Sequence, residues 1–417
     1  MAARAIASAV LALLAGHAAA FHSGGVGDCE GCHSMHGKDG PDVPGRPFLM
    51  SGGDASSTCL SCHAGMAPAT GHVFSTGFAT PPSNYTPAGD YAWLLRSYVW
   101  NGPKGVATSP GERHGHSVVA ADFNLLGDTR NTAAPGGTYP SGSLSCISCH
   151  DPHGRYRILS DGTFSAGGAR IVASGSYATS TPLPAEREAY GSYRLLGGRG
   201  YQPRSLGGAL SFGSNPPVAI APPAYNRSEA VSDVRVAYGS GMSEWCANCH
   251  GAIHTSANPT GPGSYQHPSG VTARFGQLAS IYNAFLRTGD MGGSWLTAYT
   301  SLVPYEEGTT DRSQLASHAR GDGTYRIGPT TGGENVMCLS CHRAHASGWD
   351  YGMRWNFESE YVVASGQWPG VDSVGEAAKP ANAQGRTQAE TRAAMYDRNP
   401  SSYASFQTTL CNKCHAK

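Results

Sequence analysis

The sequence has few charged residues and no cysteine outside one repeated motif. Asp, Glu, Lys and Arg make up 14% of the 417 residues, and 29 basic side chains balance 29 acidic ones. This balance gives no reason to expect a nucleic-acid partner, which selects basic patches. Hydrophobic residues make up a modest 40%, alongside 56 Gly and 27 Pro. Something other than a large apolar core should therefore hold the chain together.

Residues 1–20 have the pattern of a secretory signal peptide. Arg4 precedes an apolar run from Ala5 to Ala15, and Ala18, Ala19 and Ala20 form a small-residue cleavage site. A buried N-terminal helix is the alternative. The run is shorter than the roughly 18 apolar residues of a membrane span, and no later stretch approaches that length. We expect cleavage before Phe21, export, and one continuous unit over residues 21–417.

The cysteines form six CxxC pairs, and a histidine follows each pair. A redox dithiol needs one such motif and no histidine. Paired CxxC units could bind zinc, but zinc explains neither the invariable histidine nor the export signal. Covalent attachment of c-type haem explains both, because the thiols bind the haem and the histidine ligates its iron. The six predicted haem sites are Cys29, Cys32 and His33; Cys59, Cys62 and His63; Cys146, Cys149 and His150; Cys246, Cys249 and His250; Cys338, Cys341 and His342; and Cys411, Cys414 and His415.

Ten further histidines remain in the mature chain, more than six haems need as distal ligands. This excess favours bis-histidine ligation, which gives low-spin iron at lower potential than Met/His ligation. Within the His-Gly-His triplet we favour His116 over His114. The candidates that we favour are His36, His72, His116, His153, His267 and His345, with His22, His254 and His318 held in reserve.

Three of the motifs continue as CHxxH, which adds His36, His153 and His345. A histidine three residues after the proximal ligand stays on the proximal side of its own haem. If it ligates an iron, that iron belongs to another haem, and the two haems are then held close together.

The spacing of apolar residues predicts few regular elements. Helical periodicity favours helices over Ala273–Leu286 and Thr387–Tyr396, with short ones around Ser243–His254 and Ser402–Lys413. Long strands are not evident, and the motifs follow no fixed repeat period. We expect a mostly irregular multihaem cytochrome c with a few short α-helices and minimal β-structure, in which the haem chain is the core.

Beyond the motifs, longer stretches are similar to a known family. They include FHSGG at 21–25, CEGCHSMH at 29–36, APGGTYP at 134–140, SCHDPHG at 148–154, GMSEWCANCH at 241–250, CLSCHRAHASG at 338–348 and CNKCHAK at 411–417. The chain resembles the OmcS-type outer-surface hexahaem c-type cytochromes, which form conductive filaments in metal-reducing bacteria. The resemblance implies stacked bis-histidine haems in a mostly coil fold. It also implies head-to-tail assembly, in which His36 ligates the haem at Cys338 and Cys341 of the next subunit.

These observations favour extracellular electron transfer through a filament at the outer cell surface. The resemblance implies redox cytochromes of the periplasm or outer membrane as partners, and metal oxides or electrodes as acceptors. A monomeric electron carrier is the first alternative. A multihaem reductase is the second, but it needs a haem with an open axial position, and no motif stands out as one. We therefore expect a protein that is not an enzyme.

Overall fold

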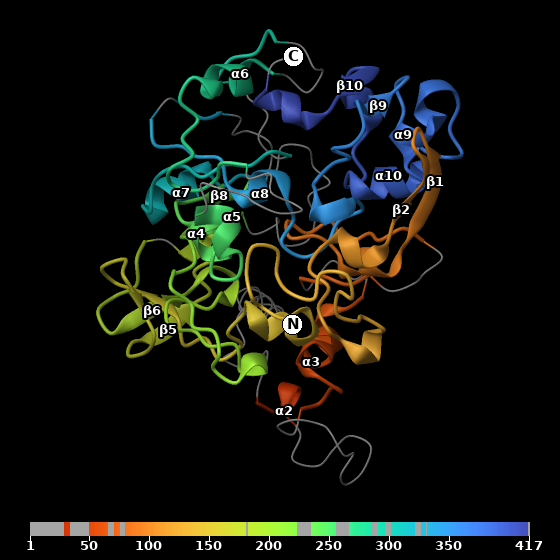
Figure 1. The fold of residues 1–417 in the computed structure, drawn as a ribbon. Coiled ribbons are helices and arrows are strands. Elements are labelled where there is room, and N and C mark those ends of the chain that lie inside the picture. The colour runs from red at the N-terminus through yellow and green to blue at the C-terminus, as the bar shows by residue number, and fades with distance from the viewer. Residues whose placement is uncertain are drawn as a thin grey trace, which may run out of the picture.

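The computed structural model describes residues 29–33, 50–65, 71–75, 80–180, 182–222, 235–255, 267–285, 291–296, 302–321, 327–330 and 332–415. The predicted signal peptide, His22 and His36 lie outside the described residues. The chain runs from α2 at one end of the molecule, through α3, to α4 and α8 in the middle, and it ends at the opposite side (Figure 1).

The helices are short, and the longest in the described part of the chain has nine residues. Short helices are expected where glycine and proline are frequent, because both residues disfavour helix interiors. The α-helices are α2 Cys29–Cys32, α3 Ala55–His63, α4 Met242–Cys246, α5 Gly251–Thr255, α6 Leu278–Ala284, α7 Arg312–His318, α8 Cys338–Cys341, α9 Pro380–Ala383 and α10 Gln388–Ala394.

Single turns of 3-10 helix connect many of the other segments. They are η3 Tyr91–Leu95, η4 Gly111–His114, η5 Ala121–Phe123, η6 Ser141–Ser143, η7 Cys146–Ser148, η8 Ala178–Ser180, η9 Tyr193–Leu195, η10 Arg204–Leu206, η12 Asp350–Gly352, η13 Gly375–Ala378, η14 Pro400–Ser402 and η15 Leu410–Lys413.

The strands form small sheets on the two flanks of the molecule (Figure 1). The largest has the order β4-β3-β6-β5, and within it β5 and β6 are parallel. The pairs β1-β2, β7-β8 and β9-β10 are antiparallel. The strands are β1 Tyr98–Gly102, β2 Gly105–Ser109, β3 Arg157–Leu159, β4 Phe164–Ser165, β5 Arg170–Ala173, β6 Glu188–Gly191, β7 Ala219–Ile220, β8 Ala237–Tyr238, β9 Tyr361–Ala364 and β10 Phe406–Thr408.

The predicted fold class is confirmed, and two of the predicted helices need correction. Helix α10 matches its prediction, and it begins with a capping box between Thr387 and Glu390. The helix predicted over Ala273–Leu286 begins only at Leu278, because Gly276 has a φ of +50°. The segment predicted as helix over Ser402–Lys413 contains strand β10, which pairs with β9, and the turn η15.

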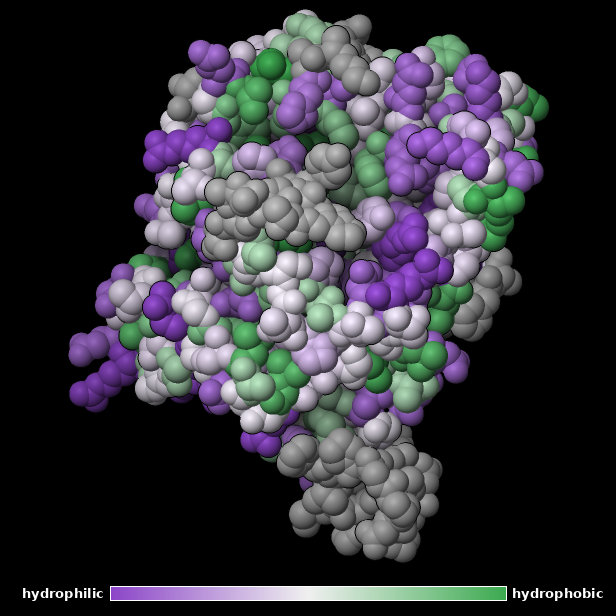
Figure 2. Space-filling model, in the orientation of Figure 1, coloured by the Kyte–Doolittle hydropathy of each residue, from purple (hydrophilic) through white to green (hydrophobic). Residues whose placement is uncertain are grey.

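The apolar side chains gather in several separate clusters rather than in one core. The largest contains Trp355 and Trp368, and Cys341, Cys411 and Cys414 pack against it. A second cluster, around Tyr193 and Tyr238, borders Cys149 and Cys246. On the surface shown in Figure 2, polar and apolar residues are interspersed. These two clusters therefore lie against motif cysteines, where the sequence predicts haems.

Candidate haem-binding sites

Each CxxCH motif lies on a single helical turn that holds its histidine next to its cysteines. In five motifs the backbone N–H of the histidine donates to the backbone carbonyl of the first cysteine, at 2.7–3.1 Å. His63 ends helix α3, which carries the second motif. All twelve thiols are free, as haem attachment requires.

At two places, motifs that are consecutive in the sequence also lie next to each other in space, and their first cysteines make the contact. The thiol of Cys59 hydrogen-bonds that of Cys146, which raises the pKa of Cys59 and lowers that of Cys146. Cys246 and Cys338 make the same contact with the same directions of shift. The second and third motifs therefore touch, and so do the fourth and fifth.

At the other three steps, the second cysteines of consecutive motifs lie close enough for their charges to interact. Burial raises the pKa of the Cys32, Cys149 and Cys341 thiols. The next cause of each shift is the charge of the second cysteine in the following motif. The pairs are Cys32 with Cys62, Cys149 with Cys249, and Cys341 with Cys414. First-cysteine contacts thus alternate with second cysteines that lie near one another, and the six motifs form one row in sequence order.

A buried serine hydroxyl supports each of the two contacts between first cysteines. Neither serine was identified from the sequence. Ser56, three residues before Cys59, accepts the Cys146 N–H at 3.1 Å. Ser243, three residues before Cys246, accepts the Cys338 N–H at 3.1 Å. Both serines are fully buried. The shared Ser-x-x-Cys spacing was the available signal, but only the fold shows what the hydroxyls bind.

Four motif histidines face a second imidazole from a distant part of the chain. An iron bonded to two imidazoles at roughly 2 Å each places their ring centroids roughly 6 Å apart. The structure therefore fits a bis-histidine haem at these four places. The ring centroids of His33 and His153 are 6.4 Å apart, those of His150 and His345 6.3 Å, those of His250 and His116 5.9 Å, and those of His415 and His267 5.9 Å.

Backbone carbonyls hold many of these rings through the Nδ1 atom. His150 Nδ1 lies 2.7 Å from Arg194 O, and His116 Nδ1 lies 2.7 Å from Ala344 O. An Nδ1–H that donates to a carbonyl leaves Nε2 as the metal-binding atom. The same contact, at 2.8–3.2 Å, joins His63 to Gly71, His250 to Pro135, His267 to Pro268 and His342 to Tyr351.

One of these contacts depends on a glycine in the APGGTYP stretch. A Cβ on Gly137 would lie 1.8 Å from the Cys249 carbonyl oxygen, so only glycine fits beside the fourth motif. This close approach brings the Pro135 carbonyl to His250.

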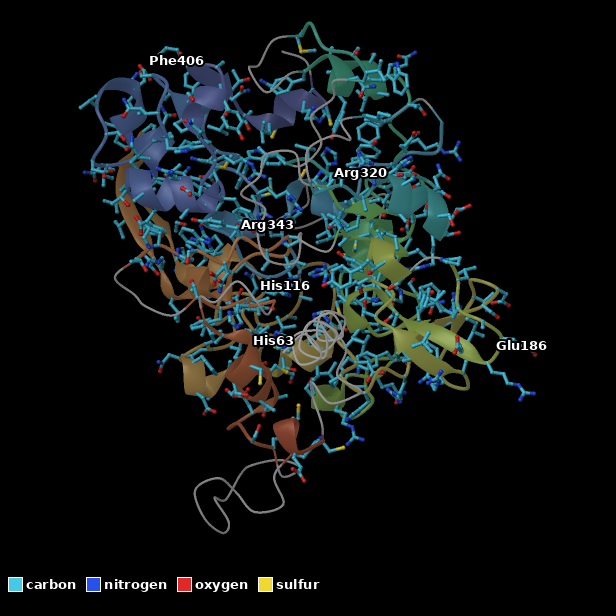
Figure 3. All side chains as sticks on the ribbon, turned by 180° about the vertical axis from the view of Figure 1, so that it is seen from behind. His63, His116, Glu186, Arg320, Arg343 and Phe406 are labelled. Atoms are coloured by element: carbon cyan, nitrogen blue, oxygen red, sulfur yellow. The ribbon has the colours of Figure 1, made fainter. Side chains whose placement is uncertain are left out.

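Two of these imidazoles favour their neutral form, which is the form that ligates iron. Desolvation by the surrounding chain lowers the pKa of His116 to about 4, with the charge of His250 as the next cause, although the residue is partly open to solvent. Desolvation also lowers the pKa of the half-buried His345 to about 3, and the charges of His150, His116 and His63 add to the effect. Figure 3 labels His63 and His116, which lie near the middle of the molecule in that view.

The remaining candidates are placed less specifically. His72 packs beside Gly65, two residues past His63, and a Cβ there would lie 3.3 Å from its ring. His318 binds the Glu307 carboxylate through Nδ1 at 2.5 Å. His254 lies on α5. For His342, no ring contact with another histidine is found in the described part of the chain.

His114, in contrast to the candidate ligands, binds other protein groups through its ring. It is fully buried, Nδ1 contacts the Trp93 carbonyl at 2.9 Å, and Nε2 contacts Ser109 Oγ at 2.8 Å. Since both ring nitrogens are engaged by protein, the geometry supports the preference for His116 within the triplet.

Among the described residues, no cluster of three or more His, Cys, Asp or Glu side chains is arranged to bind a metal ion. Iron held by a macrocycle needs only two axial side chains, so the paired imidazoles suit haem better than zinc. Within the same residues, none of the helices has the length and apolarity needed to cross a bilayer.

Comparison with known proteins agrees with this geometry. Residues 22–68 match the family model of the doubled CXXCH motif. The chain is 46% identical to the C-type cytochrome OmcS of Geobacter sulfurreducens, over 99% of this chain and 98% of that protein.

The fold is similar to two solved structures, each covering 95% of this chain and all of the other. The structure of OmcS nanowires from Geobacter sulfurreducens, determined by cryo-electron microscopy, has a TM-score of 0.84 at 44% identity. The outer membrane cytochrome S filament from the same organism has a TM-score of 0.82 at 45% identity. The chain therefore belongs to the OmcS family of c-type cytochromes and binds six haems c.

Proposed function

We propose that this protein carries electrons out of the cell through six stacked bis-histidine haems, as a subunit of a head-to-tail filament at the outer cell surface. The observation that carries the proposal is the row of six motifs, in which the cysteines of each motif lie near those of the next. Residues 1–20 are the export signal, and residues 21–417 form one hexahaem unit.

The chain's own residues position the haems. The cysteines fix each macrocycle to its helical turn, the backbone carbonyls orient the imidazoles, and the contacts between motifs set the spacing of the haems. Haem bound at these sites would supply the redox chemistry, which is the exchange of single electrons between neighbouring irons. Spacing and electrostatics, rather than substrate binding, are then what the protein controls.

Axial ligation argues against a reductase. A reductase needs an iron with an open position, whereas four motif histidines face a second imidazole. We assign these pairs as the axial ligands of the first, third, fourth and sixth haems, and His72 as the distal ligand of the second. The protein then has no catalytic role.

The CHxxH histidines support assembly into a filament. His153 of the third motif faces His33 of the first, and His345 of the fifth faces His150 of the third. In both pairs, the CHxxH histidine faces the proximal histidine of the motif two places earlier in the sequence. His36, in the first motif, has no earlier motif in its own chain, and the same step of two places takes it to the fifth haem of a neighbouring subunit. This contact would supply the second ligand opposite His342.

Such a contact joins two different surfaces, and it therefore generates an open chain of subunits unless the rotation closes a ring. The similar solved structures are described as nanowires and as a filament. Redox cytochromes of the periplasm or outer membrane would load this filament, and extracellular metal oxides or electrodes would receive its electrons.

Replacing His36 by Ala tests the assembly. We expect normal export and six haems per subunit but no filaments, because the fifth haem loses its external ligand. His153→Ala is the matched comparison, because it should disturb the first haem within a single subunit. Negative-stain microscopy and haem counting check both variants. Normal filaments from His36→Ala would refute the junction, and a wild-type protein that never polymerises would favour the monomeric carrier.

Spectroscopy tests the ligation. Oxidised filaments should show six-coordinate, low-spin haem only, because every iron has two imidazoles. Subunits dissociated from the filament should lose the low-spin signal of about one haem in six. A substantial high-spin signal from intact filaments at neutral pH would instead indicate an open axial site and a reductase.

A further inference from the structure

The C-terminal part of the chain buries positive charge without burying negative charge. All residues from Cys338 to His415 are described, and their buried charged side chains are all cations. No Asp or Glu in this stretch is buried. A buried cation is unstable without an anionic partner or a full set of hydrogen bonds. The buried cations, each at most 2% exposed, are Arg343, Arg354, Arg386, Arg398 and Lys413.

Hydrogen bonds within the protein account for two of these cations. Arg386 donates to the carbonyls of Gly348 and Gln384 and to Ser109 Oγ, at 2.6–3.0 Å. Lys413 donates to the Tyr282 and Phe285 carbonyls at the end of α6, at 3.1 and 3.2 Å. Such contacts with the C-terminus of a helix stabilise a cation.

Arg398 differs from these two cations. Its Nη1 donates to the Met395 carbonyl at 3.2 Å. Its Nε and Nη2 are buried, and neither has a hydrogen-bond partner in the described part of the chain. The neighbouring carboxylate of Asp397 is exposed and pairs with Arg392 instead. A side chain that is 2% exposed thus keeps two N–H donors for a ligand.

The surroundings of Arg398 point to that ligand. Its carbonyl accepts the Trp368 Nε1–H at 2.9 Å. Trp368 and Met395 belong to the cluster against which Cys341, Cys411 and Cys414 pack. In the same cluster Trp355 has a buried Nε1–H without a partner among the described residues. The unmet donors of Arg398 and Trp355 therefore lie beside or within the cluster that borders the last two haem-attachment sites.

We propose that the Arg398 guanidinium binds a propionate carboxylate of the haem attached at Cys338 and Cys341 or of the haem attached at Cys411 and Cys414. Each haem c carries two propionates, which are the only anions that haem attachment brings into this region. The parallel N–H groups of a guanidinium match a carboxylate with two hydrogen bonds. The inference rests on the proposed haem sites but not on polymerisation.

The pair has an electrochemical consequence. Charge and hydrogen bonding around a haem set its reduction potential. Removing the guanidinium leaves an uncompensated carboxylate near the iron, which favours the ferric state. The potential of the haem that Arg398 serves should then fall.

The experiment is a spectroelectrochemical titration of the full holoprotein. We expect Arg398→Gln to move about one sixth of the haem absorbance change to lower potential, and Arg398→Lys to move it less. Arg392→Gln is the matched control, because Arg392 is exposed and a few residues away. A wild-type map from cryo-electron microscopy should show Nε or Nη2 within about 3.2 Å of a propionate, and it identifies which of the two haems is bound.

Two results would overturn the proposal. One is an Arg398→Gln protein with six haems and an unmoved titration. The other is a wild-type map in which the guanidinium contacts no propionate. This map tests the proposal even if the Arg398→Gln protein does not accumulate. Fewer than six haems in the wild type, counted by mass spectrometry, would instead overturn the haem sites themselves.

Discussion

Two buried serine side chains hold neighbouring motifs together. Ser56 and Ser243 each accept the N–H of the first cysteine of the following motif. Losing such a contact leaves a part-buried N–H without a partner, and the full cost for a buried group is about 1–3 kcal/mol. Single hydroxyls therefore determine how closely two haem sites approach.

We predict that Ser243→Ala lowers the thermal stability of the holoprotein by about 1–3 kcal/mol, because the Cys338 N–H loses its acceptor. Ser280→Ala is the control, because Ser280 is exposed and, among the described residues, its hydroxyl binds only the Gln277 carbonyl of its own segment. Melting curves followed by haem absorbance measure the difference. Equal melting temperatures for the two variants would contradict this role of the serine.

At the scale of elements, helix α4 begins against a buried carboxylate. The Met242 N–H donates to Glu306 Oε1 at 2.8 Å. Burial, followed by the charge of Glu244, raises the pKa of Glu306 from its ordinary 4.5 to about 7. Folding therefore takes up a proton between these two pH values. The stability that Glu306 contributes is complete below about pH 4.5 and is lost as the pH rises to about 7.

Glu306→Gln should remove this pH dependence, because the amide stays neutral. We predict that the stability of the variant relative to the wild type increases by about 1–3 kcal/mol between pH 5 and pH 8. Thermal melts at several pH values test this. A difference that does not change with pH would show that Glu306 is ionised in the folded protein.

At the scale of the whole molecule, the haem sites join separate apolar clusters. Cys149 borders the cluster around Tyr193 and Tyr238, and Cys341 borders the cluster around Trp355. Helix α2, which carries the first site, buries none of its residues. Haems in the middle of the row should therefore contribute more to the stability of the fold than the haem at its end.

We predict that Cys146→Ser with Cys149→Ser, which removes the third haem, leaves a protein that loses its fold or is degraded on export. Cys29→Ser with Cys32→Ser, which removes the first haem, should leave a folded protein with five haems. Limited proteolysis and haem counting distinguish the two results. Equal resistance to protease in both variants would contradict a core built around the central haems.

The sequence by itself determined the local features. Six CxxCH motifs predict six haem attachment sites, because the two thiols and the histidine of each site lie on one turn of the backbone. The scarcity of apolar residues predicts the mostly irregular fold. Helix α10 was predictable because its capping box and apolar spacing are local, whereas β10 was missed because its partner β9 is distant in the sequence.

Only the tertiary structure decided which groups meet. His153 faces His33, and His116 faces His250, across long stretches of chain that no spacing rule relates. The order of the motifs in the row and the unmet donors of Arg398 depend on the same long-range packing. The physical reason is that an axial ligand is selected by its position in space opposite the iron, and that position depends on how the whole chain folds around the haems.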